Sequence, residues 1–385
     1  MRNDGEMIGF IFLAIAPLAS FSLAPVTTAK QRVLAGLAAL TRPVRERLPR
    51  TRQQRLHRYH VPDDFDYQRC TFSQYQGHNG SSSAFRSKYG SIRAGLDPGY
   101  HGTYSAERQA LQDRLLDDAL RGVEGGRAVP WLVFTAGAMG SGKGHTIQHL
   151  VDRGVVPLHK MQVLDPDLFK ASLPEWRGYL LRDPLRAGFH TRRESGYLLE
   201  VAQEHALRTR RHVWIDGSLR DGDWYRKEFE RIRREHPSYK IAIVHVVATR
   251  TTVIQRAESR TRVTGRHVPV SEIDDSIERV PRSVGGLRSL VDFLAVVDNS
   301  AARPYLVEFC DTDTCQVCVD DWEQLASRLW DDQGDEGCGD APGQEVSGRG
   351  ARGESGEECV IDEQIARNFE ATRRTSSAAR SDEWG

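Results

Sequence analysis

The sequence carries no excess of charge of either sign. Its 53 lysine and arginine residues balance 53 aspartate and glutamate residues, so the formal net charge at pH 7 is zero. Nucleic acids and acidic surfaces attract proteins with an excess of positive charge. We therefore expect no nucleic acid as a partner, and no protein partner can be inferred.

Lysine and cysteine are both scarce. Lysine occurs only seven times, so the positive charge is nearly all arginine. Three of the six cysteines cluster at Cys310, Cys315 and Cys318, but a zinc site needs a fourth ligand at matched spacing. The cysteines are therefore interpreted as free thiols, and nothing demands an oxidising compartment.

The apolar segment 7–29 contains no charged residue, and the arginine-rich segment 30–58 follows it. Its length fits a signal sequence and is marginal for a membrane span. Three alternatives stay open: a membrane anchor through 7–26 with the rest of the chain facing the cytoplasm, an organelle-targeting presequence, or a mis-assigned start codon. Localisation is left open accordingly.

Composition divides the chain into four parts. The apolar segment 1–29 precedes an arginine-rich and irregular extension over 30–100. A domain is predicted over 101–330, with its core at 131–299. The tail 331–385 is rich in glycine and charged residues, with few large apolar groups to offset the entropy of ordering, so we expect disorder there and expect order to decay after Ala302.

Apolar runs alternate with amphipathic segments between Trp131 and Asn299. Unbroken apolar strands indicate burial on both faces of a parallel sheet. The sequence predicts an α/β fold, a five-stranded parallel sheet with helices on both faces. The strands are expected at 131–136, 161–165, 212–216, 240–248 and 293–299, and the helices at 106–123, 144–153, 191–210, 223–236, 250–263 and 320–330.

A glycine-rich stretch, TAGAMGSGKGHTI over 135–147, follows the first strand. Gly137, four residues and then Gly142-Lys143 is the spacing of a loop whose backbone N–H groups cradle phosphate, with the lysine reaching the β- and γ-phosphates. This predicts an ATP site, and its cofactor-binding residues are Gly137, Ala138, Met139, Gly140, Ser141, Gly142, Lys143, Gly144 and His145.

Gly144 occupies the position at which such loops carry a serine or threonine hydroxyl for magnesium. Either water fills that position, or Asp216 holds Mg²⁺ through water. A scaffold that binds nucleotide without catalysis is a third alternative.

Acidic residues follow the second and third strands. The stretch LDPDLFK carries Asp165 and Asp167, and WIDGS carries Asp216 and Ser218. Ligands of parallel sheets bind beyond the carboxyl ends of the strands, so Asp167 is expected to face Lys143 and to accept a proton from a substrate hydroxyl. The alternative role for Asp167 is a helix N-cap.

Arginines follow the fourth strand, in RAESRTRVTGRHVP, at Arg256, Arg260, Arg262 and Arg266. Guanidinium groups at the ligand edge can stabilise charge on a phosphoryl group in transfer. The alternative is a solvated basic face of a helix.

Taken together, these motifs resemble the zeta toxin family of P-loop kinases over about 131–299. The matching stretches are GAMGSGK, LDPDLFKASLPE, ESGYLLEVAQEHAL, VWIDGSLRD, RTRVTGRHVP, ERVPRSVGGLRSLVD and VVDN. The resemblance implies ATP- and Mg²⁺-dependent phosphorylation of a sugar-nucleotide hydroxyl, with UDP-N-acetylglucosamine as the acceptor of the bacterial toxins.

The resemblance also implies roles for individual residues. It places the base on Asp167, substrate contacts on Glu200, Asp216, Ser218 and Arg220, and the charge-stabilising arginines on Arg262 and Arg266, with Arg260 as a rival. A kinase of this fold with a metabolite or a polynucleotide end as acceptor remains an alternative.

Overall fold

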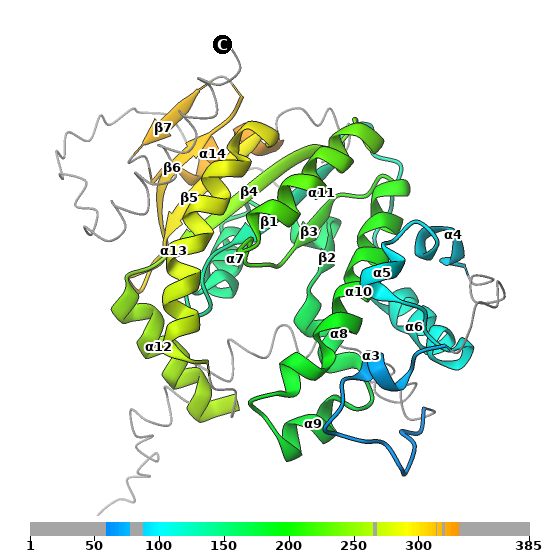
Figure 1. Cartoon of the computed structure of the whole chain (residues 1–385). Coiled ribbons are helices and arrows are strands. Elements are labelled where there is room, and N and C mark those ends of the chain that lie inside the picture. Colours follow the sequence, from blue (N-terminus) through cyan, green and yellow to red (C-terminus); the bar gives the residue numbers. More distant parts are fainter. Residues whose placement is uncertain (1–58, 78–87, 265–267, 313, 318–319, 331–385) are drawn as a thin grey trace, which may run out of the picture. The chain divides into compact units, whose positions relative to one another are not determined.

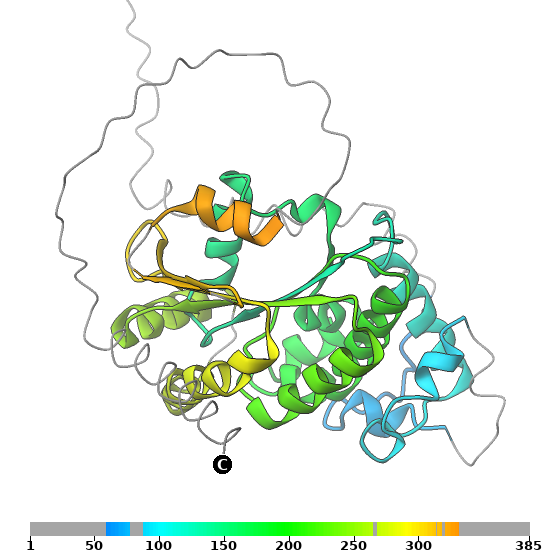
Figure 2. The ribbon, with the colours of Figure 1, turned by 90° about the horizontal axis from the view of Figure 1, so that it is seen from above.

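The computed structural model describes residues 59–77, 88–264, 268–312, 314–317 and 320–330. Their elements form a mixed sheet with helices on both of its faces (Figures 1 and 2). The predicted segments 1–29 and 331–385, and the apolar stretch 7–26, lie outside the described residues. Among the described helices, none combines the length and apolar character needed to cross a membrane.

The sheet has seven strands in the order β2-β3-β1-β4-β5-β6-β7. The first five are parallel, which confirms the predicted five-stranded parallel sheet. Their bounds are β1 Trp131–Ala136, β2 Gln162–Leu164, β3 Val213–Ile215, β4 Lys240–Val247 and β5 Phe293–Asp298. The expectation that order decays after Ala302 is wrong, because β6 (Tyr305–Cys310) and β7 (Cys315–Val317) extend the sheet in antiparallel orientation.

Strand β1 lies in the middle of the sheet and is buried along its whole length. Leu132 and Phe134 pack into the larger apolar cluster on one face, and Trp131 and Val133 pack into the cluster on the other. Successive side chains of a strand point to opposite faces. A strand that is buried at every position therefore belongs in a sheet covered on both sides.

The helices divide between the two faces of the sheet. In Figure 2, α7 and α14 lie above the sheet and α10, α11 and α13 lie below it. The longer helices are α6 Ala106–Ala119, α7 Lys143–Asp152, α10 Ala187–Arg208, α11 Gly222–Glu235, α12 Arg250–Thr264, α13 Val270–Leu287 and α14 Trp322–Trp330. The shorter ones are α3 Thr71–Gln74, α4 Gly90–Arg93, α5 Pro98–His101, α8 Pro166–Ser172 and α9 Trp176–Arg182, with 3-10 turns η2 Leu158–Lys160 and η3 Arg288–Leu290.

Cys310 and Cys315 form a disulfide that joins the paired strands β6 and β7. The interpretation of these two residues as free thiols is wrong. They are separated by five positions in the sequence, and the antiparallel hairpin places them directly opposite each other. Cys70 is a free thiol, as expected.

The segment that precedes β1 packs on α10 through a buried ionic cluster. Arg108 of α6 is fully buried, and it donates to Glu194 of α10 at 2.6 and 2.8 Å and to Glu175 at 2.8 and 3.0 Å. Burial of both carboxylates requires this bidentate partner, because an unpaired buried charge is strongly unfavourable. The pKa of Glu194 is lowered by the charge and hydrogen bonds of Arg108, against the opposing effect of burial.

Removing this guanidinium is expected to destabilise the protein strongly. Arg108→Ala leaves Glu175 and Glu194 buried without their partner, and we expect the loss to be about 3–5 kcal/mol. Urea unfolding followed by circular dichroism measures it. Arg114→Ala, an exposed arginine on the same helix, is the control and should change stability by less than about 0.5 kcal/mol. Equal unfolding midpoints for the two variants would contradict this account of the cluster.

Candidate active site

The glycine-rich loop lies between the carboxyl end of β1 and the start of α7. Gly137, with φ 149°, approaches the β4 backbone so closely that a Cβ would lie 2.5 Å from the carbonyl oxygen of Val246. Gly142, with φ 86°, precedes α7 in a left-handed conformation that favours glycine. The loop therefore has the backbone form that aims N–H groups and a helix N-terminus at a bound anion.

Asn299, the last residue of the stretch VVDN, fixes the loop from the end of β5, a role that the stretch alone did not predict. Its buried side chain donates to the carbonyl oxygens of Ser141 at 2.9 Å and Gly142 at 3.2 Å. His145 of α7 contacts the Asn299 Oδ1 through its Nδ1 at 3.0 Å. Arg256 of α12 donates to the Asn299 carbonyl oxygen at 2.7 Å. Strand β5 and helix α12 thus hold the loop in place.

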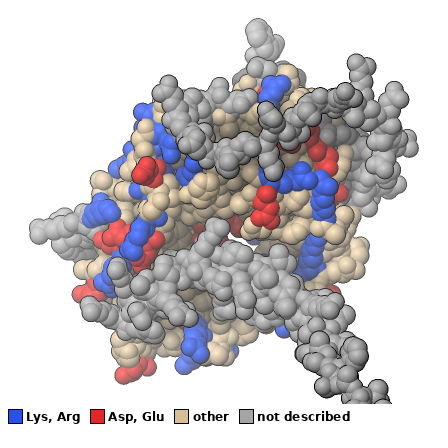
Figure 3. All heavy atoms as spheres, turned by 180° about the vertical axis from the view of Figure 1, so that it is seen from behind, with Lys and Arg blue, Asp and Glu red and all other residues tan. Residues whose placement is uncertain are grey.

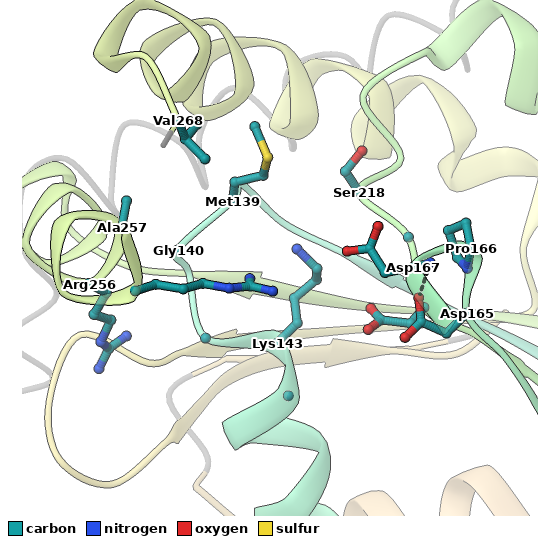
Figure 4. Close-up of a pocket in the computed structure, with 15 residues that line it drawn as sticks. Met139, Gly140, Lys143, Asp165, Pro166, Asp167, Ser218, Arg256, Ala257 and Val268 are labelled. Carbon is teal, nitrogen blue, oxygen red and sulfur yellow. Dashed lines mark hydrogen bonds between the residues drawn. The ribbon is translucent and has the colours of Figure 1, made fainter. Parts of the chain in front are cut away.

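Lys143 and Asp167 face one cleft, as the kinase hypothesis requires. The cleft has a volume of about 520 Å³, and Lys143, Asp165, Asp167, Asp216, Arg256 and Arg260 are among its lining residues. In Figure 4 the Lys143 side chain rises from the loop into the cleft, and Asp165 and Asp167 lie across from it. The cleft lies at the carboxyl edge of the parallel strands, where such sheets bind ligands.

The ammonium of Lys143 is held within the loop itself. Its Nζ donates to the carbonyl oxygens of Gly137 at 3.0 Å and Ala138 at 3.3 Å. Burial lowers its pKa, the negative charge of Asp216 opposes that effect, and the positive charge of Arg260 adds to it. Anionic phosphate oxygens in the cleft would favour the charged form of this lysine.

The aspartates at the ends of β2 and β3 have distinct partners. Asp165 is the N-cap of α8, and its Oδ1 accepts the backbone N–H of Asp167 at 2.7 Å. The alternative role suggested for Asp167, the N-cap of a helix, thus belongs to Asp165. Asp167 accepts a hydrogen bond from Lys170 at 2.8 Å, and 44% of its side chain is exposed, so an acceptor molecule can reach it.

Thr135 of β1 orients the carboxylate of Asp216 at the end of β3. Its hydroxyl donates to the Asp216 Oδ1 at 2.8 Å and accepts the backbone N–H of Gly217 at 3.1 Å. The Thr135 side chain is buried, so this orientation is rigid. Thr135 begins the glycine-rich stretch, but its role was not predicted, because it depends on pairing between strands about 80 residues apart.

The carboxylates lie close enough to affect one another's charge. Burial, together with the negative charges of Asp216 and Asp167, raises the pKa of Asp165 to about 7. Asp165 and Asp216, which follow the neighbouring strands β2 and β3, offer carboxylate oxygens of the kind that Mg²⁺ prefers. Gly144 contributes none, and a Cβ added there would meet nothing within 4 Å. The residues present fit a magnesium ion held from the strand ends.

The arginines of α12 separate into two groups. Arg256 and the rival candidate Arg260 line the cleft. Arg262 does not line it; its side chain is 79% exposed and lies 3.9 Å from Glu258. Arg266 lies outside the described residues. The roles given to Arg262 and Arg266 stay predictions.

The residues predicted to contact substrate are not all gathered in the cleft. Asp216 and Ser218 line it, whereas Arg220 lines a neighbouring hollow and lies 3.6 Å from Asp275. Glu200 of α10 contacts the buried His101 of α5 at 2.9 Å. The substrate contacts predicted for these residues stay predictions.

Buried parallel strands, a glycine-rich loop with its lysine and a facing aspartate define a P-loop kinase. The family model for the zeta toxin matches residues 114–306, and the chain belongs to the zeta toxin family. It is therefore an ATP-dependent phosphotransferase. A comparison with curated proteins finds no match.

Solved structures with a similar fold include three of low identity. One, from the PezAT chromosomal toxin–antitoxin system of Streptococcus pneumoniae, is 14% identical over 53% of this chain and 82% of that chain, with a TM-score of 0.43. An AvrRxo1-ORF1:-ORF2 complex with ATP is 15% identical over 81% and 94%, with a TM-score of 0.45. A putative kinase from Chloroflexus aurantiacus is 13% identical over 52% and 97%, with a TM-score of 0.34.

The raised pKa of Asp165 predicts a pH-dependent stability. The folded pKa of about 7 lies above the ordinary 3.8, so the folded protein keeps this proton after the unfolded chain has released it. Stability therefore falls as the pH rises from 3.8 to about 7 and levels off above that. Asp165→Asn keeps a capping oxygen without the charge. Without nucleotide and divalent cation, we expect this variant to gain about 2–3 kcal/mol relative to wild type between pH 5 and pH 8.

Thermal unfolding at the two pH values measures this gain. Asp63→Asn, at a side chain that is 98% exposed, is the control and should show no gain. A gain for Asp165→Asn that is the same at both pH values would contradict the pKa assignment.

Proposed function

We propose that this protein transfers the γ-phosphate of ATP to a hydroxyl group of a small molecule, with a sugar nucleotide such as UDP-N-acetylglucosamine as the acceptor class. The observation that carries the proposal is the single cleft shared by Lys143 and Asp167. The family membership supports the reaction type, and the resemblance of the motifs supports the acceptor class.

The nucleotide end of the cleft is formed by the loop and the start of α7. Lys143 and the loop N–H groups hold the β- and γ-phosphates, which replace the carbonyl oxygens that Lys143 now contacts. Arg256 and Arg260 line the cleft beside the loop and supply positive charge near the phosphoryl group. Arg262 and Arg266 are proposed to add further positive charge near the phosphoryl group when nucleotide is bound.

Asp167 accepts the proton at the acceptor end. The acceptor hydroxyl gives its proton to the Asp167 carboxylate while its oxygen bonds to the γ-phosphorus, and the bond from that phosphorus to the leaving oxygen of ADP breaks. Lys170 fixes the orientation of the carboxylate from one turn along α8. Ser218 lines the cleft close to Asp167, where its hydroxyl can bind the acceptor.

Asp216, with Asp165 beside it, would hold the magnesium ion. When bound, Mg²⁺ neutralises charge on the β- and γ-phosphates. Thr135 keeps the Asp216 carboxylate oriented towards the cleft, and Asp165 ionises readily once a cation approaches. These two carboxylates compensate for the missing side-chain oxygen at Gly144.

Replacing the proposed base is expected to abolish turnover without weakening nucleotide binding. Asp167→Asn keeps the shape of the side chain but cannot accept the proton, and we expect ADP formation with a panel of sugar nucleotides to fall at least about 100-fold. Binding of ATP should change less than about threefold.

Asp183→Asn, in the turn before α10, is the matched control and should keep wild-type turnover. Wild-type turnover by Asp167→Asn would show that the base is wrongly assigned. ATP binding by the wild-type protein without transfer to any acceptor would favour the scaffold alternative.

A further inference from the structure

Two buried polar side chains at the glycine-rich loop lack a hydrogen-bond partner among the described residues. They are Ser141, through its Oγ, and His245, through its Nδ1, and the two residues are 1% and 2% exposed. At the surface, where basic and acidic side chains lie interspersed on the face opposite to the view of Figure 1, water satisfies such atoms (Figure 3). In the interior each polar atom needs a partner of its own.

His245 lies in the middle of the apolar strand β4. It is the single polar residue of the stretch IAIVHVV over 241–247, and it pairs with Ala136, the last residue of β1 before the loop. Ile243 and Val247, two positions away on either side, belong to the larger apolar cluster, so His245 points to the same face. Burial lowers the pKa of His245 to about 4. The ring is therefore neutral at pH 7, and one of its nitrogens can accept a hydrogen bond.

Ser141 is the loop residue two positions before the phosphate-binding lysine. Its carbonyl oxygen accepts from Asn299 at 2.9 Å and from Arg256 at 3.4 Å. Its hydroxyl lies against the backbone of β4, since a Cβ added to Gly137 would lie 2.7 Å from the Ser141 Oγ and 2.5 Å from the Val246 carbonyl oxygen. The main chain of Ser141 is thus held by β5 and α12, and its side chain lies beside β4.

A small cavity lies between the loop, β4 and α13. Ser141 and His245 line it together with Ile277 and Pro281 of α13, and ten of its eleven lining residues are buried. The centre of a water molecule can occupy about 20 Å³ of this cavity. By this measure one water molecule needs roughly 10–15 Å³. The cavity therefore has room for one water molecule.

Helix α13 offers a third polar group to this cavity. Pro281 has no N–H, so it cannot donate to the carbonyl oxygen of Ile277 four residues earlier. Because both residues line the cavity, this oxygen can accept from a water molecule there. A buried water needs two to four polar partners. A hydroxyl, an imidazole nitrogen and a carbonyl oxygen supply three.

We propose that the cavity binds one water molecule that joins the glycine-rich loop to β4 and α13, and that Ser141 and His245 are positioning residues for ATP. The Ser141 hydroxyl donates to the water, which donates to the His245 Nδ1 and to the Ile277 carbonyl oxygen. With the contacts of Asn299 and Arg256, this water holds the loop in the form that presents its N–H groups to phosphate. The proposal concerns the ATP site alone and stands whatever acceptor the kinase phosphorylates.

Calorimetry with a non-hydrolysable ATP analogue tests the proposal without an acceptor. Ser141→Ala and His245→Leu each remove one partner of the water, and each should weaken binding about 3–10-fold, the effect of one lost hydrogen bond. Because both residues act through the same water, the double variant should bind within about twofold of the weaker single variant. Losses that multiply in the double variant overturn the proposal.

Two further substitutions separate hydrogen bonding from packing. His245→Asn places an amide where the Nδ1 lies and should keep the affinity for the analogue within about twofold of wild type, whereas His245→Gln places its amide at the Nε2 position and should not. His190→Leu is the matched control, because His190 is also buried with an Nδ1 that lacks a partner among the described residues, but lies on α10 outside the cleft. It should leave the affinity unchanged. Equal affinities of the Asn and Gln variants overturn the role of His245.

A high-resolution crystal structure of the wild-type protein tests the water directly. We expect one water molecule within hydrogen-bond distance of both the Ser141 Oγ and the His245 Nδ1. A dry cavity, or a direct hydrogen bond between the two side chains, overturns the proposal even if a variant fails to fold. Failure of the wild-type protein to bind ATP would count against the kinase activity itself, and the crystal structure would still decide the question of the water.

Discussion

The parallel register of β1, β2 and β3 is the constraint on which the whole site depends. It brings a partly buried lysine and three carboxylates to one edge of the sheet. Burial then shifts the pKa of Lys143 downwards and that of Asp165 upwards, so the charged form of each side chain is disfavoured in the protein alone. Phosphate favours the charged lysine and a cation favours the ionised aspartate. A nucleotide and a divalent cation bound together in the cleft would thus stabilise the charged forms of both residues.

Much of the fold could be predicted, because buried parallel strands leave an unbroken apolar pattern. Strand β6 was not predicted, since the buried Glu308 interrupts its apolar run, and β7 is short and partly exposed. Helix α13 contains Pro281, which the sequence alone favours as a helix end. Packing of Val280 and Val284 into the core holds this helix together against that local preference.

The candidate site could be predicted only where local spacing encodes it. Lys143 and Asp167 follow from the glycine loop and from the end of a strand. Thr135 and Asn299 were missed because their hydrogen bonds join residues about 80 and about 160 positions apart. The choice among the α12 arginines depends on how the helix lies over the cleft, which the sequence does not fix. His101 likewise meets Glu200 only through the packing of α5 on α10.

The central claim is that one cleft transfers a phosphoryl group from ATP to a small-molecule hydroxyl. The most direct test is mass spectrometry of a metabolite extract incubated with the protein, Mg²⁺ and ATP labelled with ¹⁸O in the γ-phosphate. The account predicts a labelled phosphomonoester of a nucleotide-linked metabolite with the wild-type protein and none with a variant that lacks the Asp167 carboxylate. Label found only in inorganic phosphate, or the same labelled product from both proteins, would contradict it.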